Sequence, residues 1–364
     1  MTPAPTKTAK IGVLLVNLGT PDSPDVADVR RYLGEFLMDP RVIDIPAAAR
    51  WALVHGIILR TRPRKSAAAY REVWGERGSP LRYHGLDLVA GLRDRLGPRV
   101  ADVALAMRYQ NPSIRSALEA FADRAIDDVV VVPLFPQYSQ AAWASAYDEV
   151  VLQAGRLRNV PTLRFVPPFY DHPAFLDAVA VVAEPALARF GPERVLMSFH
   201  GLPNTHIRRS DASGGDHCLR GVGCCEAIQE VNRFCYRAQC FATARGIAKR
   251  LRLSEGMFEV TFQSRLTRNW IEPFTDVRLA QLPAEGVRRV AVLCPSFVAD
   301  CLETLEEVGL RAAASFTEAG GDELLAVPCV NADPAWVSGL AQILAEREPL
   351  LATLAEARPS GAAH

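Results

Sequence analysis

The sequence predicts an α/β protein made of two Rossmann-like domains, each a four-stranded parallel sheet flanked by helices. Its 364 residues exceed what one ordinary hydrophobic core accommodates, so two domains are expected. Eight short runs are almost continuously apolar instead of alternating, which is typical of parallel strands buried on both faces. Helix-like segments lie between most of these runs, and strands that alternate with helices indicate a doubly wound fold.

The expected elements follow one another regularly along the chain. The strands are Ile11–Val16, Val103–Met107, Val129–Leu134, Leu163–Val166, Val195–Phe199, Phe258–Phe262, Val290–Leu293 and Leu324–Val327. The helix-like segments include Pro24–Leu37, Gly85–Leu96, Ser113–Ala122 and Ala238–Leu251. A last helix, from about Pro334 to Leu354, is expected to return to the first domain.

The simplest partition gives four strands to each domain. Residues 10–168 together with 334–355 form the expected N-terminal domain, and residues 169–333 form the C-terminal domain. The break falls in the segment Pro167-Pro168-Phe169-Tyr170. The second domain then carries His200, Glu303 and a cysteine-rich insertion at residues 211–240.

Composition excludes several classes of function. Lys+Arg and Asp+Glu both number 41, which gives no electrostatic reason to expect a nucleic-acid partner. The first ten residues lack the apolar stretch of a signal peptide, and no apolar run approaches the roughly 20 residues that span a bilayer. We therefore expect a cytoplasmic protein with reduced thiols. Neither G-x-G-x-x-G nor a P-loop occurs, so no nucleotide cofactor is expected.

A histidine stands at the end of the fifth expected strand, in Ser198-Phe199-His200-Gly201-Leu202-Pro203. Open α/β sheets bind their ligands at the carboxyl ends of the strands. A neutral imidazole there could ligate Fe²⁺ or accept a proton near pH 7. A turn histidine bonded only to backbone is the alternative interpretation, and the residues alone leave both open.

Two acidic residues follow the strand that ends at Leu293. Asp300 and Glu303 have the spacing of a helix N-cap and its third residue, so a capping box is a complete structural explanation. The alternative is a carboxylate in a cleft opposite His200. The spacing favours the capping box and does not exclude the second hypothesis.

Five of the eight cysteines lie in one glycine-containing segment of 23 residues, at Cys218, Cys224, Cys225, Cys235 and Cys240. In a chain without an export signal such a group indicates metal binding more than disulfides. A [2Fe–2S] cluster needs four thiolates and tolerates irregular spacing, and it is favoured over zinc and over free thiols. The three remaining cysteines are explained as buried thiols.

The segment Ile57–Lys65 passes from apolar residues to Arg60, Arg62, Arg64 and Lys65. A solvated charge run explains it. An apolar edge beside cations would also suit an amphiphilic, carboxylate-bearing ligand or a membrane surface.

Taken together, the motifs resemble those of ferrochelatases, the enzymes that insert Fe²⁺ into a porphyrin to make haem. The likeness covers about residues 10–354. It rests on motifs in the same order: Val16–Asp22, Gly78-Ser79-Pro80-Leu81, Ala106-Met107-Arg108-Tyr109, Pro133–Ser139, Ser198–Pro203, Phe262-Gln263-Ser264-Arg265 and Phe297–Leu305.

The resemblance implies two Rossmann-like domains with a porphyrin cleft between them, and porphyrin and Fe²⁺ as the substrates. It implies that His200 is the essential histidine and that Glu303 faces it across the cleft, with Asp300 on the same side as Glu303. Positions expected near the macrocycle are Leu18, Arg108, Tyr109, Tyr138, Gln263 and Trp270. His200 would accept a proton or hold iron on one face of a bent ring, with an acidic route on the other face.

Three positions depart from the family pattern. Phe135 replaces a frequent tyrosine, and Cys301 occupies a place often held by histidine. The third departure is the cysteine insertion, which is similar to that of bacterial relatives with an internal [2Fe–2S] cluster. Cys240 is the weakest of the five candidates, because relatives without a cluster often have a cysteine there.

Leu18 favours protoporphyrin IX over coproporphyrin III, since relatives that use coproporphyrin tend to have tyrosine at this place. A coproporphyrin ferrochelatase, a cobaltochelatase and a haem-binding iron–sulfur sensor are the alternatives. The resemblance leaves a monomer and a homodimer both open, and it fits a cytoplasmic protein with peripheral contact at the inner membrane.

Overall fold

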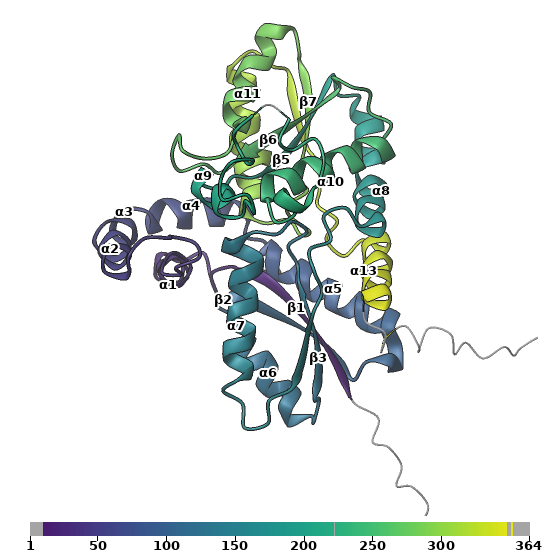
Figure 1. Ribbon diagram of the computed structural model, residues 1–364. Coiled ribbons are helices and arrows are strands. Elements are labelled where there is room, and N and C mark those ends of the chain that lie inside the picture. The colour runs from purple at the N-terminus through teal and green to yellow at the C-terminus, as the bar shows by residue number, and fades with distance from the viewer. Residues whose placement is uncertain (1–9, 222, 348–350, 352–364) are drawn as a thin grey trace, which may run out of the picture.

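The computed structural model describes residues 10–221, 223–347 and 351 and contains two four-stranded parallel sheets (Figure 1). Their strand orders are β2-β1-β3-β4 and β6-β5-β7-β8. The strands are β1 Ile11–Gly19, β2 Asp102–Tyr109, β3 Asp128–Pro133, β4 Thr162–Phe165, β5 Arg194–His200, β6 Phe258–Gln263, β7 Arg289–Leu293 and β8 Glu323–Ala326. Every expected strand is present within three residues of its expected ends. The predicted fold class is confirmed.

Strand β1 shows why the strands lack an alternating pattern. Val13 and Leu15 pack into one core with Leu88 and Leu92 of helix α5 (Pro80–Leu96), whereas Leu14 lies in a second core. That second core is built with helices α6 (Ile114–Asp123) and α7 (Ser145–Ala154) on the other face of the sheet. Because both faces are covered, the strand is apolar along almost its whole length, with Asn17 near its carboxyl end as the exception.

The second sheet is built in the same way around β5. Met197 and Phe199 pack toward helix α10 (Tyr236–Arg250). Leu196 packs on the opposite face with Leu279 of α11 (Thr275–Gln281) and Val308 of the π-helix η6 (Glu303–Ala312). The helices of the two lobes are α5 Pro80–Leu96, α6 Ile114–Asp123, α7 Ser145–Ala154, α8 Pro173–Phe190, α9 Asn204–Arg209, α10 Tyr236–Arg250, α11 Thr275–Gln281, α12 Ala313–Glu318 and α13 Pro334–Arg347. Short 3₁₀ helices are η2 Gly97–Arg99, η4 Glu230–Asn232 and η5 Leu282–Glu285.

Among the described residues, three segments are π-helical: η1 Val54–Ile58, η3 Gln140–Ala144 and η6 Glu303–Ala312. The last of these begins at Glu303, one of the expected site residues. Single turns of π-helix occur often at functional sites, and here the π-helix extends over ten residues.

Helix α13 packs against α5 of the first lobe and α8 of the second (Figure 1). Its Trp336 is fully buried against Phe169 and Phe175. The partition into residues 10–168 plus 334–355 and residues 169–333 stays a prediction, and its positions 348–350 and 352–355 lie outside the described residues. The two sheets fall on either side of its boundary at residue 168.

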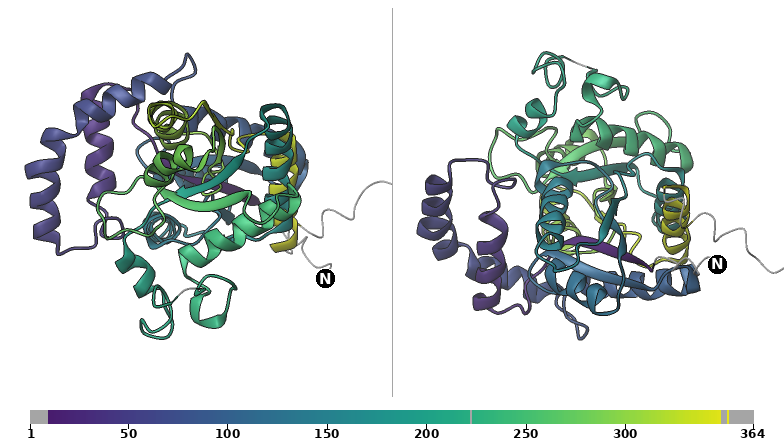
Figure 2. Two further views of the ribbon diagram at one scale, coloured as in Figure 1. Left: turned by 90° about the horizontal axis from the view of Figure 1, so that it is seen from above. Right: turned by 60° about the horizontal axis from the view of Figure 1, so that its bottom comes forward.

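Helices α1 Val26–Leu37, α2 Ala47–Leu53, α3 Leu59–Thr61 and α4 Pro63–Val73 project together from one side of the molecule (Figures 1 and 2). They have their own small core, in which Val29 and Tyr32 of α1 pack against Ala67 and Tyr70 of α4. Of these helices the sequence pattern predicted only α1. None of the helices that the structure describes is long and apolar enough to cross a membrane.

The insertion at residues 211–235 projects from the second lobe in both views of Figure 2 and is mostly turns. Helix α10 begins at Tyr236, so Cys240 lies inside the helix, not before it.

Candidate active site

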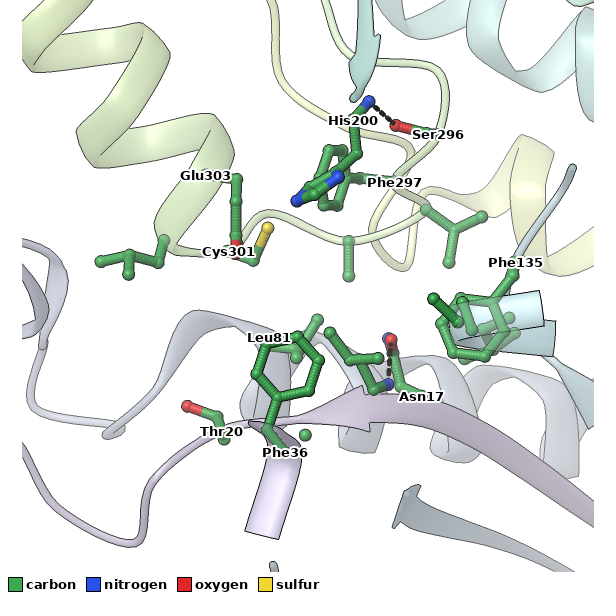
Figure 3. A pocket seen from close by; sticks show the side chains of 18 of the residues that line it. Asn17, Thr20, Phe36, Leu81, Phe135, His200, Ser296, Phe297, Cys301 and Glu303 are labelled. Carbon is green, nitrogen blue, oxygen red and sulfur yellow. Dashed lines mark hydrogen bonds between the residues drawn. The ribbon is translucent and has the colours of Figure 1, made fainter. Parts of the chain in front are cut away.

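A cavity of about 1050 Å³, counted together with its open mouth, lies between the two lobes (Figure 3). In Figure 3 the second lobe contributes His200, Ser296, Phe297, Cys301 and Glu303 on one side, and the first lobe faces them with Asn17, Thr20, Phe36 and Leu81. The carboxyl ends of the central strands β1 and β5 both reach this cavity, as ligand sites in open α/β sheets do. Of the expected site residues, Leu18, His200 and Glu303 line it.

His200 is the last residue of β5, and its ring is fixed by hydrogen bonds to the neighbouring backbone. Nδ1 lies 2.7 Å from the carbonyl oxygen of Gly201, and the backbone N–H donates to Ser296 Oγ at 3.1 Å. A carbonyl can only accept, so Nδ1 carries the proton and Nε2 of the neutral ring keeps a lone pair. The histidine is therefore bonded to backbone and also presents a basic nitrogen at the cavity.

Two aromatic rings flank this imidazole: Trp270 at 6.4 Å and Phe297 at 6.3 Å between ring centroids. Gly201 permits the approach of Trp270, because a Cβ there would stand 2.8 Å from the Gln263 carbonyl oxygen and 3.1 Å from the Trp270 ring. Trp270 itself does not line the cavity. Its ring contacts the His200 imidazole from outside the cavity.

Glu303 opens the π-helix η6, and its backbone is fixed by Gln263. The Gln263 amide donates to the Glu303 carbonyl at 3.3 Å, and Ser198 Oγ donates to Gln263 Oε1 at 2.6 Å. The Cys301 thiol is hydrogen-bonded to the Glu303 carboxylate, and burial together with that carboxylate raises the pKa of Cys301 well above its usual range. Gln263 thus acts on the site through Glu303 and not as part of the cavity wall.

The capping box proposed for Asp300 and Glu303 does not form. The Asp300 carboxylate instead accepts bonds from Thr304 Oγ1 at 3.0 Å, the Cys329 N–H at 3.2 Å and Asn331 Nδ2 at 2.7 Å. Asp300 is buried and lies outside the cavity lining. Its oxygens already have three donors, so its observed role is to join the start of η6 to the loop after β8.

Arg108 and Tyr109 lie outside the lining of this cavity. Both donate to the buried carboxylate of Asp39, Arg108 Nη2 at 2.7 Å and Tyr109 Oη at 2.8 Å. Ser145 Oγ completes this network at 2.5 Å from Asp39. The network fixes the end of β2 behind Phe36, whose ring contacts Tyr109 and lines the cavity. Tyr138 lines a second, adjacent cavity.

Comparison with known proteins identifies the family. The ferrochelatase family model matches residues 10–348. A ferrochelatase of Azotobacter vinelandii is 49% identical over 341 residues, covering 91% of this chain and 97% of its own. Ferrochelatases of Pseudomonas putida and Coxiella burnetii are 45% and 44% identical and cover 91% and 92% of this chain, with 97% and 93% of their own lengths. The chain belongs to the ferrochelatase family.

Solved structures agree at the level of the fold. The protein SirB from Bacillus subtilis with Fe³⁺ superposes with a TM-score of 0.50 at 15% identity, covering 96% of this chain and 98% of that one. A second SirB structure, a sirohydrochlorin chelatase in complex with cobalt, has a TM-score of 0.50 at 11% identity and covers 93% and 96% of the two chains. The likeness shows a shared chelatase fold.

Beside this ferrochelatase cavity, sequence reasoning missed a second carboxyl group. Glu307 follows Glu303 by four residues on η6 and accepts bonds from the Ser264 N–H at 2.9 Å and the Ser264 hydroxyl at 2.6 Å. Burial and the nearby Glu303 carboxylate raise the pKa of Glu307. The four-residue spacing on a predicted helix was the available signal.

The apolar walls were also missed as site residues, although several lie in motifs that carried the family resemblance. Phe135 follows β3, Leu81 lies in α5 and Phe297 precedes η6. Each reaches the cavity only because the strand ends meet there, which no local pattern reports.

The five insertion cysteines are brought near one another, but not equally. Cys224 and Cys225 have their sulfurs 3.7 Å apart, and Cys235 is near enough to Cys218 and Cys225 to shift the pKa values of both thiols. Cys240 lies fully buried in α10, bonded to Tyr236. Among the described residues, no group of three or more His, Cys, Asp or Glu side chains is arranged around one metal position.

Proposed function

We propose that this protein inserts Fe²⁺ into protoporphyrin IX, giving protohaem and two protons. One observation supports it above the others: His200 presents an unprotonated Nε2 in the same apolar cavity as the Glu303 carboxylate. An apolar cavity with few polar groups suits a flat macrocycle, and the two polar groups suit iron and departing protons. Leu18 on the wall favours apolar ring substituents and hence protoporphyrin.

The chemistry divides between the two residues. Each pyrrole N–H must lose its proton as iron enters, so two protons leave for each Fe²⁺ bound. His200 Nε2 accepts a proton from one face of the ring. Glu303 receives iron or a proton at the start of η6, and Glu307 continues the carboxyl route one turn further.

A direct experiment is an anaerobic assay of Fe²⁺-dependent loss of free-porphyrin fluorescence. Protoporphyrin IX with Fe²⁺ is expected to react well above the spontaneous rate, and coproporphyrin III and a sirohydrochlorin with Co²⁺ serve as competing substrates. Preference for coproporphyrin would overturn the assigned porphyrin, and preference for sirohydrochlorin with Co²⁺ would overturn the assigned reaction. Tight haem binding without any metal insertion would identify a sensor instead.

We also propose that a [2Fe–2S] cluster binds at Cys218, Cys224, Cys225 and Cys235, with Cys240 as the spare. Such a cluster has two thiolates on each of two irons, so it does not require three donors around one metal position. The sulfur contacts form one chain through these four residues and leave Cys240 outside it. Arg237 Nη1 lies 3.2 Å from Cys225 Sγ and supplies a cation for the negative thiolate set.

The unliganded site favours thiols. Burial raises the pKa of Cys218 to about 11, and contact with Cys235 together with burial raises that of Cys225. Positive charge from bound iron would be needed to keep these sulfurs ionised. When bound, the cluster supplies four iron–sulfur bonds that hold the insertion together.

We propose a cytoplasmic location with peripheral contact at the inner membrane through the projecting helices α2 to α4. Trp51 and Ile57 are 59% and 58% exposed there, beside exposed Arg60, Arg62 and Arg64. Apolar side chains next to cations suit an anionic lipid surface. Flotation with anionic vesicles, lost in a Trp51→Ala, Ile57→Ser variant, tests this.

A further inference from the structure

A second cavity adjoins the first and takes no part in the chemistry described above. It holds about 760 Å³, counted with its mouth, and lies between Tyr138–Gln140, helix α9 and the insertion. Ser139, Leu202 and Tyr236 line both cavities. The two cavities therefore share part of their walls.

The polar groups of this second cavity are mainly donors. His206 is 6% exposed, and its Nδ1 is buried with no hydrogen-bond partner among the described residues. Arg209 lies one α-helical turn along and pairs with Asp44 of the first lobe. A buried ring nitrogen without a partner is costly, which makes it a candidate for a ligand contact.

The acidic residue of this cavity is already satisfied. Asp211 accepts bonds from the N–H groups of Ser213, His217 and Cys218 at 2.9, 3.0 and 2.7 Å, and from the Ser213 hydroxyl. Those bonds offset its charge and leave it a poor metal ligand. Arg209 pairs with Asp44 through Nη1, and the other N–H groups of its guanidinium, together with His206, leave donors that suit an anion.

We propose that this cavity is a carboxylate subsite, in which His206 and Arg209 bind one carboxylate-bearing side arm of the porphyrin. The aromatic rings of Tyr138, Phe234 and Tyr236 form its walls, with His206 buried and Arg209 more than half exposed. Arg–carboxylate contacts are among the strongest polar contacts, and the imidazole Nδ1–H adds a second donor. The subsite fixes the rotation of the macrocycle over His200. This inference rests on the proposed porphyrin substrate.

The test compares protoporphyrin IX, which has two free carboxylates, with its dimethyl ester in detergent micelles. His206→Gln and Arg209→Gln are expected to raise KM for the diacid by about 10-fold, with kcat within about twofold, and to leave the ester unchanged. Arg208→Gln is the matched control, because Arg208 is exposed on the same helix and does not line the cavity. Its KM for the diacid should not change.

Equal effects on diacid and ester would overturn the subsite, since they would report a structural defect. An unchanged KM for the diacid in both variants would overturn it as well. Arg209 is an exposed side chain, so Arg209→Gln keeps the test valid if His206→Gln folds poorly.

A free anion could occupy the same donors. Replacing chloride with acetate at constant ionic strength tests whether the site binds the porphyrin carboxylate or a free anion. Acetate that weakens diacid binding in the wild type, but not in Arg209→Gln, supports a shared carboxylate site. Acetate binding together with equal affinity for diacid and ester would assign the site to free anions and overturn the porphyrin arm. Quenching of protein fluorescence measures binding even if no iron is inserted, so the two proposals fail separately.

Discussion

The His200 ring donates from Nδ1 to the carbonyl of Gly201, the next residue in the chain, at 2.7 Å. This bond determines which nitrogen is free at the cavity, and it forms within the turn that ends β5. His200→Ala is expected to lower kcat by about 10² to 10⁴, the range for loss of a positioned proton acceptor, with porphyrin affinity within a fewfold of wild type. Fluorescence quenching measures the affinity separately. Turnover above one tenth of wild type would contradict the assigned role.

Gly201→Ala should disturb the site without removing a polar group. The added methyl meets the Gln263 carbonyl at 2.8 Å and the Trp270 ring at 3.1 Å, so β6 or Trp270 must move. We expect a loss of about 1–3 kcal/mol in the free energy of unfolding and a fall in kcat. Urea denaturation gives the first quantity. Gly56→Ala, where a Cβ meets nothing within 4 Å, is the matched control.

Asp39→Asn is expected to destabilise the protein by about 1–3 kcal/mol, because it removes the charged acceptor of Arg108 Nη2 and leaves the guanidinium only Glu149, at 3.6 Å, as a charge partner. Asp148→Asn removes the exposed ion pair with Arg41 and should cost under about 1 kcal/mol. Urea denaturation of the two variants beside the wild type measures both losses.

The pH dependence of stability is expected to follow from the Asp39 carboxyl group. Burial alone would raise the pKa of Asp39, but bonds from Ser145, the Arg41 N–H and Tyr109 and the charge of Arg108 hold it below its usual value. A depressed carboxyl pKa stabilises the fold above the unfolded value and loses that effect as pH falls through the folded value. The stability difference between wild type and Asp39→Asn should therefore shrink below about pH 4. A constant difference would be inconsistent with this account.

For Glu307→Gln we expect the pH dependence of stability to have the opposite sign to that of Asp39→Asn. The pKa of Glu307 is raised by burial and by Glu303, so the folded state holds this proton more tightly than the unfolded chain. Stability is then lost as pH rises from the unfolded value, about 4.3, through the folded one. The glutamine variant should gain in melting temperature relative to wild type at pH 8 more than at pH 4. It should also lower kcat by about 10-fold or more if Glu307 carries protons from the cavity.

The control for Glu307 is its neighbour on η6. Glu306 pairs with Arg311 at 2.9 Å and does not line the cavity. Glu306→Gln should show neither the pH-dependent gain nor the loss of turnover.

Cysteine substitutions test the cluster assignment. Protein purified without oxygen should be coloured and hold about two irons and two acid-labile sulfides per chain. Cys225→Ser and Cys235→Ser should lose the colour and the sulfide, and Cys240→Ala should keep both. If Cys240→Ala also lost the colour and the sulfide, Cys240 would be a cluster ligand in place of one of the four proposed cysteines. Stoichiometric zinc in colourless wild-type protein would rule out the cluster.

Several site residues could be predicted from the sequence, because their positions depend on the strands that carry them. His200 follows an apolar run that only Ser198 interrupts, so the hydrophobic pattern predicts its place at a strand end. Leu18 and Glu303 came from family motifs. The helices α2 to α4 were largely missed, because their small core depends on contacts between distant residues such as Tyr32 and Tyr70.

The eight strands, the parallel α/β class and the family could all be predicted from the sequence, since strands buried on both faces are mostly apolar and the family motifs keep their order. The partners of the polar side chains became known only from the folded chain. The Asp300 carboxylate accepts bonds from three donors, and Arg108 and Tyr109 both donate to Asp39. Glu307 lies near Glu303, and Cys240 lies inside α10 with Tyr236 as its side-chain partner. The physical reason is that hydrogen bonds and burial join residues as distant in the chain as Asp39 and Ser145, and no local pattern records those partners.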